Sequence, residues 1–106
     1  METKTIPTNL RQAFKILDEM LSQEDKEYNL SQSKFEFTAD EHVGLGMWIR
    51  NEWIYGPESD EDREKSALLL KSLGAMTEDG FQIEMPDMVS DKILEKYYDH
   101  LKRKSK

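Results

Sequence analysis

Hydrophobic residues near the start of the chain recur at spacings of three and four, which predicts an amphipathic helix. The apolar positions of this first helix are Leu10, Ala13, Phe14, Leu17, Met20 and Leu21. Asn9 stands before it and Gln12 follows three residues later, which is the spacing of a helix N-terminal capping box. The polar positions between the apolar ones are expected to face water: Arg11, Lys15, Asp18 and Glu19.

Cap signals predict three further helices outside the middle of the chain. Ser22 with Asp25 predicts a short helix over residues 22–28. Ser59 with Asp62 predicts a second, which ends at Gly74 and whose expected buried positions are Ala67, Leu68, Leu70 (or Leu69) and Leu73. Pro86-Asp87 predicts the start of the last helix, whose apolar stripe is Met88, Val89, Ile93, Leu94, Tyr97 and Leu101.

Two short segments alternate between apolar and polar residues, as β-strands do. Phe35-Glu36-Phe37 fits a short strand or an extended lead-in. Phe81, Ile83 and Met85 follow a turn-like TEDG and fit a small hairpin, or pairing with Phe35–Phe37. Neither strand is secure, so the predicted fold is all-α, or mainly α with a minor hairpin.

The segment HVGLGMWIRNEW, His42 to Trp53, has apolar residues nearly all the way round a helical projection. Thr38 with Glu41 has the form of a cap, and Gly56-Pro57 is a stop, so we predict one helix over residues 39–55. A helix that is apolar all round is buried. The expected architecture is therefore a compact bundle of four to five helices around this buried central helix.

Gly44 and Gly46 oppose a continuous helix, because each costs about 1 kcal/mol against alanine in a helix interior. Close approach of a neighbouring helix, or room for an indole ring, would offset this cost. The alternative is a helix that starts after Gly46.

Arg50 is the most informative residue of the segment, since burying an unpaired guanidinium costs several kcal/mol. Its expected partners are Asp87, Asp40 or Glu52. We favour an internal arginine–carboxylate contact that fixes helix register. The alternative is a surface pocket for an acidic or planar group, lined by Arg50, Asn51 and the indoles of Trp48 and Trp53. We favour a role for the two tryptophans in the core over a role in cofactor binding. With His42, the candidate cluster is His42, Trp48, Arg50, Asn51, Trp53 and Asp87.

The sequence contains no recognisable catalytic or cofactor motif. It has no cysteine, which excludes thiolate chemistry and cysteine-ligated zinc. His42 and His100 are the only histidines, and they stand apart. We therefore expect no cofactor and no metal, and we favour a non-enzymatic protein over an enzyme.

The 106 residues fit one domain, with a loose lead-in over residues 1–7 and a basic tail over residues 102–106. Fifteen basic and 22 acidic residues give a net charge of −7, which disfavours binding to nucleic acid and to anionic membranes. The acidic run over residues 58–65 suits the first turn of a helix. No signal peptide or apolar span is evident, so we expect a cytoplasmic protein.

The run H-x-G-L-G-M-W-I-R-N-x-W (His42 to Trp53), with P-D-x-x-S-x-x-I-L-x-x-Y downstream (Pro86 to Tyr97), resembles a small bacterial domain family of unknown function. The resemblance covers roughly residues 9 to 101, and the stretch Thr77 to Met85 is longer than usual. It implies no activity. By joining the two motifs in one signature, it suggests that Asp87 or the Ser90 region packs against Arg50-Asn51.

Three functions remain open from the sequence, and the least favoured is a nucleic-acid-facing protein that acts through the basic tail, or an acidic mimic of nucleic acid. We favour a non-enzymatic interaction or accessory module that binds a partner protein, or a second copy of itself. The alternative is a small-ligand-binding protein or enzyme that uses His42, Arg50 and Asn51. A concave pocket where these three side chains meet would favour the alternative.

Overall fold

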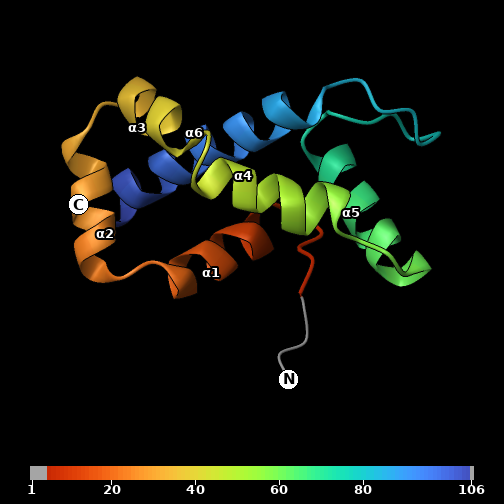
Figure 1. The fold of residues 1–106 in the computed structure, drawn as a ribbon, viewed down its shortest axis with the longest axis horizontal. Helices are drawn as coiled ribbons and strands as arrows, with labels where there is room; N and C mark the ends of the chain where they lie inside the picture. The colour runs from red at the N-terminus through yellow and green to blue at the C-terminus, as the bar shows by residue number, and fades with distance from the viewer. Residues whose placement is uncertain (1–4, 106) are drawn as a thin grey trace.

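The computed structural model describes residues 5–105, which form an all-α bundle without a β-strand (Figure 1). The predicted all-α class is confirmed. The α-helices of this region are α1 (Leu10–Met20), α2 (Gln23–Ser31), α3 (Lys34–Glu41), α4 (Leu45–Ile49), α5 (Asp60–Ser72) and α6 (Pro86–Lys104). A π-helical segment, η1 (Arg50–Tyr55), continues α4.

The central helix of the bundle is α6. Helices α1, α2, α3 and α4 and the segment η1 all pack against it, and Figure 1 shows it running behind α4. Its buried residues lie along one stripe: Val89, Ser90, Ile93, Leu94, Tyr97, Tyr98 and Leu101. A bundle around a buried helix is therefore present, but that helix is not the one that the sequence indicated.

The segment predicted as one helix over residues 39–55 is broken. Helix α3 ends at Glu41, and α4 begins at Leu45 after a turn at His42 to Gly44. The Glu41 carboxylate accepts a hydrogen bond from the Leu45 backbone N–H at 3.0 Å, so it caps the new helix. Val43 and Tyr55 are exposed, and the prediction that this segment is buried all round was wrong.

Phe35–Phe37 is helical rather than extended, because Ser33 and Glu36 form a capping box that starts α3 five residues earlier than predicted. Thr38, the predicted cap, donates its hydroxyl to the Lys34 carbonyl inside α3. The predicted hairpin is reduced to one isolated bridge between Met76 and Gln82.

The other predicted caps are present at Asn9, Ser22 and Ser59. Gly74 follows α5 with φ = 74°, a left-handed conformation that favours glycine. Leu68 was predicted to be buried on α5, but it is exposed, and Leu69 lies in the core instead.

The two ends of the described chain are tied to the bundle. Ile6 and Pro7 are buried, so the loose lead-in predicted over residues 1–7 does not extend to them. Lys102, Arg103 and Lys104 form the last turn of α6 rather than a separate tail. Residues 1–4 and Lys106 of the predicted lead-in and tail lie outside the described residues.

Candidate functional site

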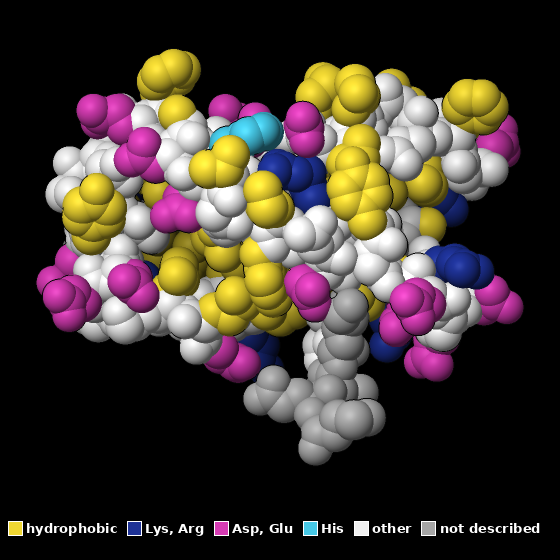
Figure 2. All heavy atoms as spheres, viewed as in Figure 1, with side chains coloured by type: hydrophobic (Ala, Val, Ile, Leu, Met, Phe, Trp, Pro, Cys, Tyr) yellow, Lys and Arg dark blue, Asp and Glu magenta, His cyan; other side chains and the backbone are white. Residues whose placement is uncertain are grey.

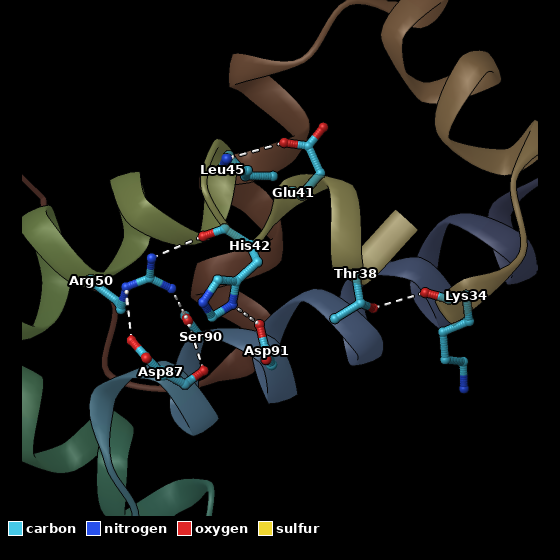
Figure 3. Close-up of polar contacts among 9 residues, drawn as sticks. All are labelled: Lys34, Thr38, Glu41, His42, Leu45, Arg50, Asp87, Ser90 and Asp91. Carbon is cyan, nitrogen blue, oxygen red and sulfur yellow. Dashed lines mark hydrogen bonds and ion pairs between the residues drawn. The ribbon is translucent and has the colours of Figure 1, made fainter. Parts of the chain in front are cut away.

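Arg50 is a buried cation at the junction of α4 and η1, where its side chain is 9% exposed. Its guanidinium makes three polar contacts, drawn in Figure 3. Nη1 donates to the Ser90 hydroxyl at 2.7 Å, and Nη2 donates to the His42 carbonyl at 2.9 Å. Nε lies 3.4 Å from a carboxylate oxygen of Asp87. A guanidinium carries its donors in a planar fork, so one side chain can hold three acceptors in fixed directions.

The two α6 partners of Arg50 lie in the first turns of that helix. Ser90 donates its own hydroxyl to the Asp87 carbonyl at 3.0 Å, which leaves its oxygen lone pairs free to accept from Arg50. The contact between Arg50 and the Asp87–Ser90 turn, suggested by the joined motifs, is therefore present. Of the other predicted partners, Asp40 instead accepts a hydrogen bond from the side-chain amide of Gln32.

His42 contributes its carbonyl to Arg50, and its ring contacts α6 separately. Nδ1 lies 2.8 Å from a carboxylate oxygen of Asp91 (Figure 3). The turn that breaks the predicted helix thus ties the backbone of His42 to Arg50 and its side chain to α6.

Gly46 allows this close approach. A Cβ atom at that position would lie 3.0 Å from the Glu41 carbonyl and 3.3 Å from both Arg50 Nη1 and Leu94 Cδ1. The predicted explanation for this glycine, close packing against a neighbouring helix, agrees with these distances.

Trp48 and Trp53 pack edge to face, with ring centroids 5.3 Å apart. Trp53 is a core residue at 1% exposure, and Trp48 packs against the core while partly buried. Trp48 lies in α4 and Trp53 in η1, so the ring contact spans the junction between the two segments.

Asn51 does not join this cluster. It is exposed, and no hydrogen bond connects it to His42 or Arg50 in the part of the chain that the structure describes. The structure brings together Arg50, the His42 carbonyl, Asp87 and Ser90, of which Ser90 was named only through the motif. The ligand-binding arrangement of His42, Arg50 and Asn51 thus lacks its third member.

A second polar cluster, which the sequence did not indicate, centres on Asp18 of α1. Its carboxylate accepts hydrogen bonds from the Tyr97 hydroxyl at 2.9 Å, His100 Nε2 at 3.0 Å and Lys104 Nζ at 3.2 Å. The Asp18 side chain is only 18% exposed, so the expectation that it faces water was wrong.

The partners of Asp18 decide its protonation. Burial alone would raise the pKa of Asp18, but the hydrogen bonds from His100, Tyr97 and Lys104 outweigh it and hold this pKa below its ordinary value. Burial, followed by the hydrogen bond to Asp18, raises the pKa of the Tyr97 hydroxyl far above its ordinary range. At neutral pH the carboxylate is therefore charged and Tyr97 is a permanent donor. Asp18 directly follows Leu17 and stands four residues after Phe14, so it lies at the edge of the apolar stripe of α1. This position is the feature of the sequence that could have indicated its partial burial.

Residues 5–105 contain neither a membrane-spanning helix nor a metal-binding cluster. No helix there is both long and apolar enough to cross a membrane. No group of three or more histidine, aspartate or glutamate side chains there is arranged to hold a metal ion.

The fold and the Arg50 cluster define a small all-α domain in which a buried arginine ties a broken helical segment to the first turns of a central helix. Residues 6–101 match the family described as Domain of unknown function (DUF6794), and the chain belongs to this family. Comparison with curated proteins and with solved structures finds no match. The predicted resemblance to a family of unknown function is therefore confirmed. The signature motif and the bacterial origin stay predictions.

Proposed function

We propose that this protein is a non-enzymatic interaction module that binds a partner protein through an exposed apolar surface beside the Arg50–Asp87 ion pair. This surface, the methionine rim, consists of Val43, Met47, Met85 and Met88. Their exposed fractions are 67, 44, 68 and 53%, respectively. The exposure of these four apolar side chains around one ion pair is the observation that carries the proposal.

Two polar contacts to α6 bring the rim residues toward one another: Arg50 pairs with Asp87, and the ring of His42, next to Val43, contacts Asp91. Met85 and Met88 stand on either side of Asp87 at the start of α6, and Met47 precedes Arg50 by one helical turn. Figure 2 shows a face of the molecule on which hydrophobic side chains surround a basic side chain and a histidine. The rim therefore lies across the contact between α4 and α6.

The composition of the rim suits protein recognition. Methionine side chains are flexible and polarisable, so they adapt to the shape of a partner. Contiguous exposed apolar groups with polar groups around them mark interaction sites in soluble proteins. Arg50 has its donors committed to His42, Asp87 and Ser90, which supports a role in holding the surface rather than in binding a ligand.

Charge favours a particular kind of partner. The nearby carboxylates of Glu84, Asp87 and Asp91 outnumber the cations Arg50 and Lys92, and the chain carries a net charge of −7. A partner that presents apolar side chains flanked by basic ones would complement this surface. A second copy of the same acidic chain would meet like charge.

The test is site-specific photo-crosslinking in the native host. A photoreactive amino acid replaces Met47 or Met88 in the rim, and Phe35 on α3 serves as the control because it is 82% exposed and apolar but outside the rim. We expect one protein adduct of defined mass from both rim positions and none from the control. Mass spectrometry of the adduct should identify a partner with a basic binding segment.

A matched pair of variants completes the test. With the photoreactive residue at Met85, the substitutions M47D and M88D should abolish the adduct, whereas F35D should leave it unchanged. Equal adducts from rim and control positions, or none from the rim, would contradict the proposal. An adduct between two copies of the chain would contradict the basic partner and would show that the rim forms a homodimer contact.

A further inference from the structure

A pocket of about 540 Å³ lies between α1 and the last turns of α6, and the methionine rim contributes nothing to it. Its size falls within the range of cavities that hold small organic ligands. The lining residues that carry the argument are Arg11, Phe14, Lys15, His100 and Arg103.

The pocket concentrates positive charge in an acidic protein. Arg11, Lys15 and Arg103 line it, and none of the three forms an ion pair within residues 5–105. Asp18 and Glu19 also line it, but the Asp18 carboxylate already accepts hydrogen bonds from Lys104, His100 and Tyr97. Glu19 is the remaining carboxylate, so the three cations leave the lining with a net positive charge in a chain whose net charge is −7.

The pocket also has a flat apolar side that is held in place. Phe14 stacks on the His100 ring with centroids 4.7 Å apart and an angle of 26° between the planes. Tyr97 stacks on the same imidazole at 5.7 Å. The hydrogen bond from Nε2 of His100 to Asp18 fixes the imidazole. Because the rings are ordered before any ligand arrives, less conformational entropy is lost on binding.

From these features we infer that the pocket binds a small organic anion with a flat apolar body, such as an aromatic carboxylate or an aryl phosphate. The anionic group is held by the guanidinium groups of Arg11 and Arg103 and the ammonium of Lys15. The ring lies against Phe14 and the methylene stems of the cationic side chains. This site is independent of the proposed partner surface.

The test is a titration of the isotopically labelled full chain followed by NMR. The probes are naphthoate, naphthyl phosphate, uncharged naphthamide and inorganic phosphate. We expect at least one naphthyl anion to bind saturably with a Kd below about 1 mM, and both naphthamide and inorganic phosphate to bind at least about tenfold more weakly. The carboxylate and phosphate probes distinguish the two sources of the anionic group. The largest shifts should be those of Phe14 and His100, while the indole signals of Trp48 and Trp53 stay fixed.

Matched variants separate the site from general charge. R11Q with R103Q removes two exposed cations and should weaken binding of the naphthyl anion at least about tenfold, with no loss of fold. R63Q removes an exposed arginine of α5 that lies outside this pocket and should change the Kd by less than about twofold.

Three results would overturn the inference. One is the absence of saturable binding by both naphthyl anions up to millimolar concentration. Another is naphthamide binding as tightly as the anions, which would remove the role of the cations. The third is an equal loss of affinity in R63Q and in the double variant, which would indicate non-specific attraction.

Discussion

The two ends of α6 each hold a buried charge, a cation at the N-terminal end and an anion at the C-terminal end. Arg50 is 9% exposed and its carboxylate partner Asp87 is 64% exposed. Asp18 is 18% exposed and its ammonium partner Lys104 is 60% exposed. In both clusters one charge is withdrawn from water while its counter-charge stays hydrated.

Both buried charges also lie at the unfavourable end of the α6 dipole, because a helix attracts anions at its N-terminus and cations at its C-terminus. The residues that satisfy the dipole, Asp87 in the first turn and Lys104 in the last, are the same residues that pair with the buried charges. At each end, α6 therefore offsets a charge that its dipole disfavours with a side chain of opposite charge from its own terminal turn. The clusters differ in that Arg50 supplies all the donors from one side chain, whereas Asp18 collects donors from several.

Removing the cation should have the largest effect. R50A leaves the His42 carbonyl without its donor and creates a cavity, so we expect a loss of about 2–3 kcal/mol in the free energy of unfolding. That corresponds to a drop of roughly 10–20 °C in Tm for a domain of this size. Urea denaturation and calorimetry measure both quantities. R50M is the control for volume, and stability equal to wild type in R50A would show that the cation is not a structural tie.

Removing the anion should have the next largest effect and should depend on pH. D18N keeps an acceptor for Tyr97 but loses the charge, and we expect it to cost about 1–2 kcal/mol at pH 7. Because folding lowers the pKa of Asp18, its contribution is present above the ordinary pKa of about 3.9 and is lost as pH falls through the lower folded value.

The stability difference between wild type and D18N should therefore shrink as the pH falls below about 4. Urea denaturation of both proteins in this acidic range is the measurement, and subtraction removes the contribution of carboxylates that do not contact Asp18. A difference that grows as the pH falls below about 4 would contradict the lowered pKa.

Removing one donor should cost less than removing the carboxylate that it serves. Y97F deletes the hydroxyl that donates to Asp18 and leaves the ring in the core, so we expect a loss of about 1 kcal/mol. It should also raise the pKa of Asp18 toward its ordinary value, since one stabilising hydrogen bond is gone. NMR titration of the Asp18 carboxyl carbon measures that shift, and an unchanged pKa would assign the lowering to His100 and Lys104 alone.

Removing either hydrated counter-charge should have the smallest effect. D87A and K104A should each cost less than about 1 kcal/mol, because Arg50 keeps its hydrogen bonds to Ser90 and His42, and Asp18 keeps those from Tyr97 and His100. R50A should thus destabilise far more than D87A although both break the same pair. Equal losses in these two variants would show that the ion pair itself, rather than the buried hydrogen bonds of Arg50, carries the stability.

The sequence predicted the first cluster and missed the second for a physical reason. A charge inside an apolar run, as at Arg50, signals a buried partner without any knowledge of the fold. Asp18 falls among polar positions of its helix, and its burial depends on where α6 arrives from the other end of the chain. Its partner Tyr97 was assigned to the core, with no indication that its hydroxyl had an acceptor.

Local helix signals were similarly informative where the cap decided the structure, as at Ser22 and Ser59. These signals predicted the wrong helix bounds at residues 39–55, because Ser33, Thr38 and Glu41 are three possible caps close together in the sequence. Thr38 was predicted to cap, but Ser33 had already started the helix, and Glu41 caps the following one. The π-helical turn at Arg50–Tyr55 has no signature in apolar periodicity, so a projection at 3.6 residues per turn did not predict it.

The position of α6 in the chain has a consequence for the order of events during synthesis. The helix against which α1, α2, α3 and α4 pack is the last to be made among the helices of residues 5–105. While the ribosome extends the chain from its N-terminus, the apolar stripes of the earlier helices lack the surface that α6 provides. The Asp18–Tyr97 contact, between residues 79 positions apart, cannot form until α6 has emerged past Tyr97. Compact folding of residues 5–105 therefore waits for α6.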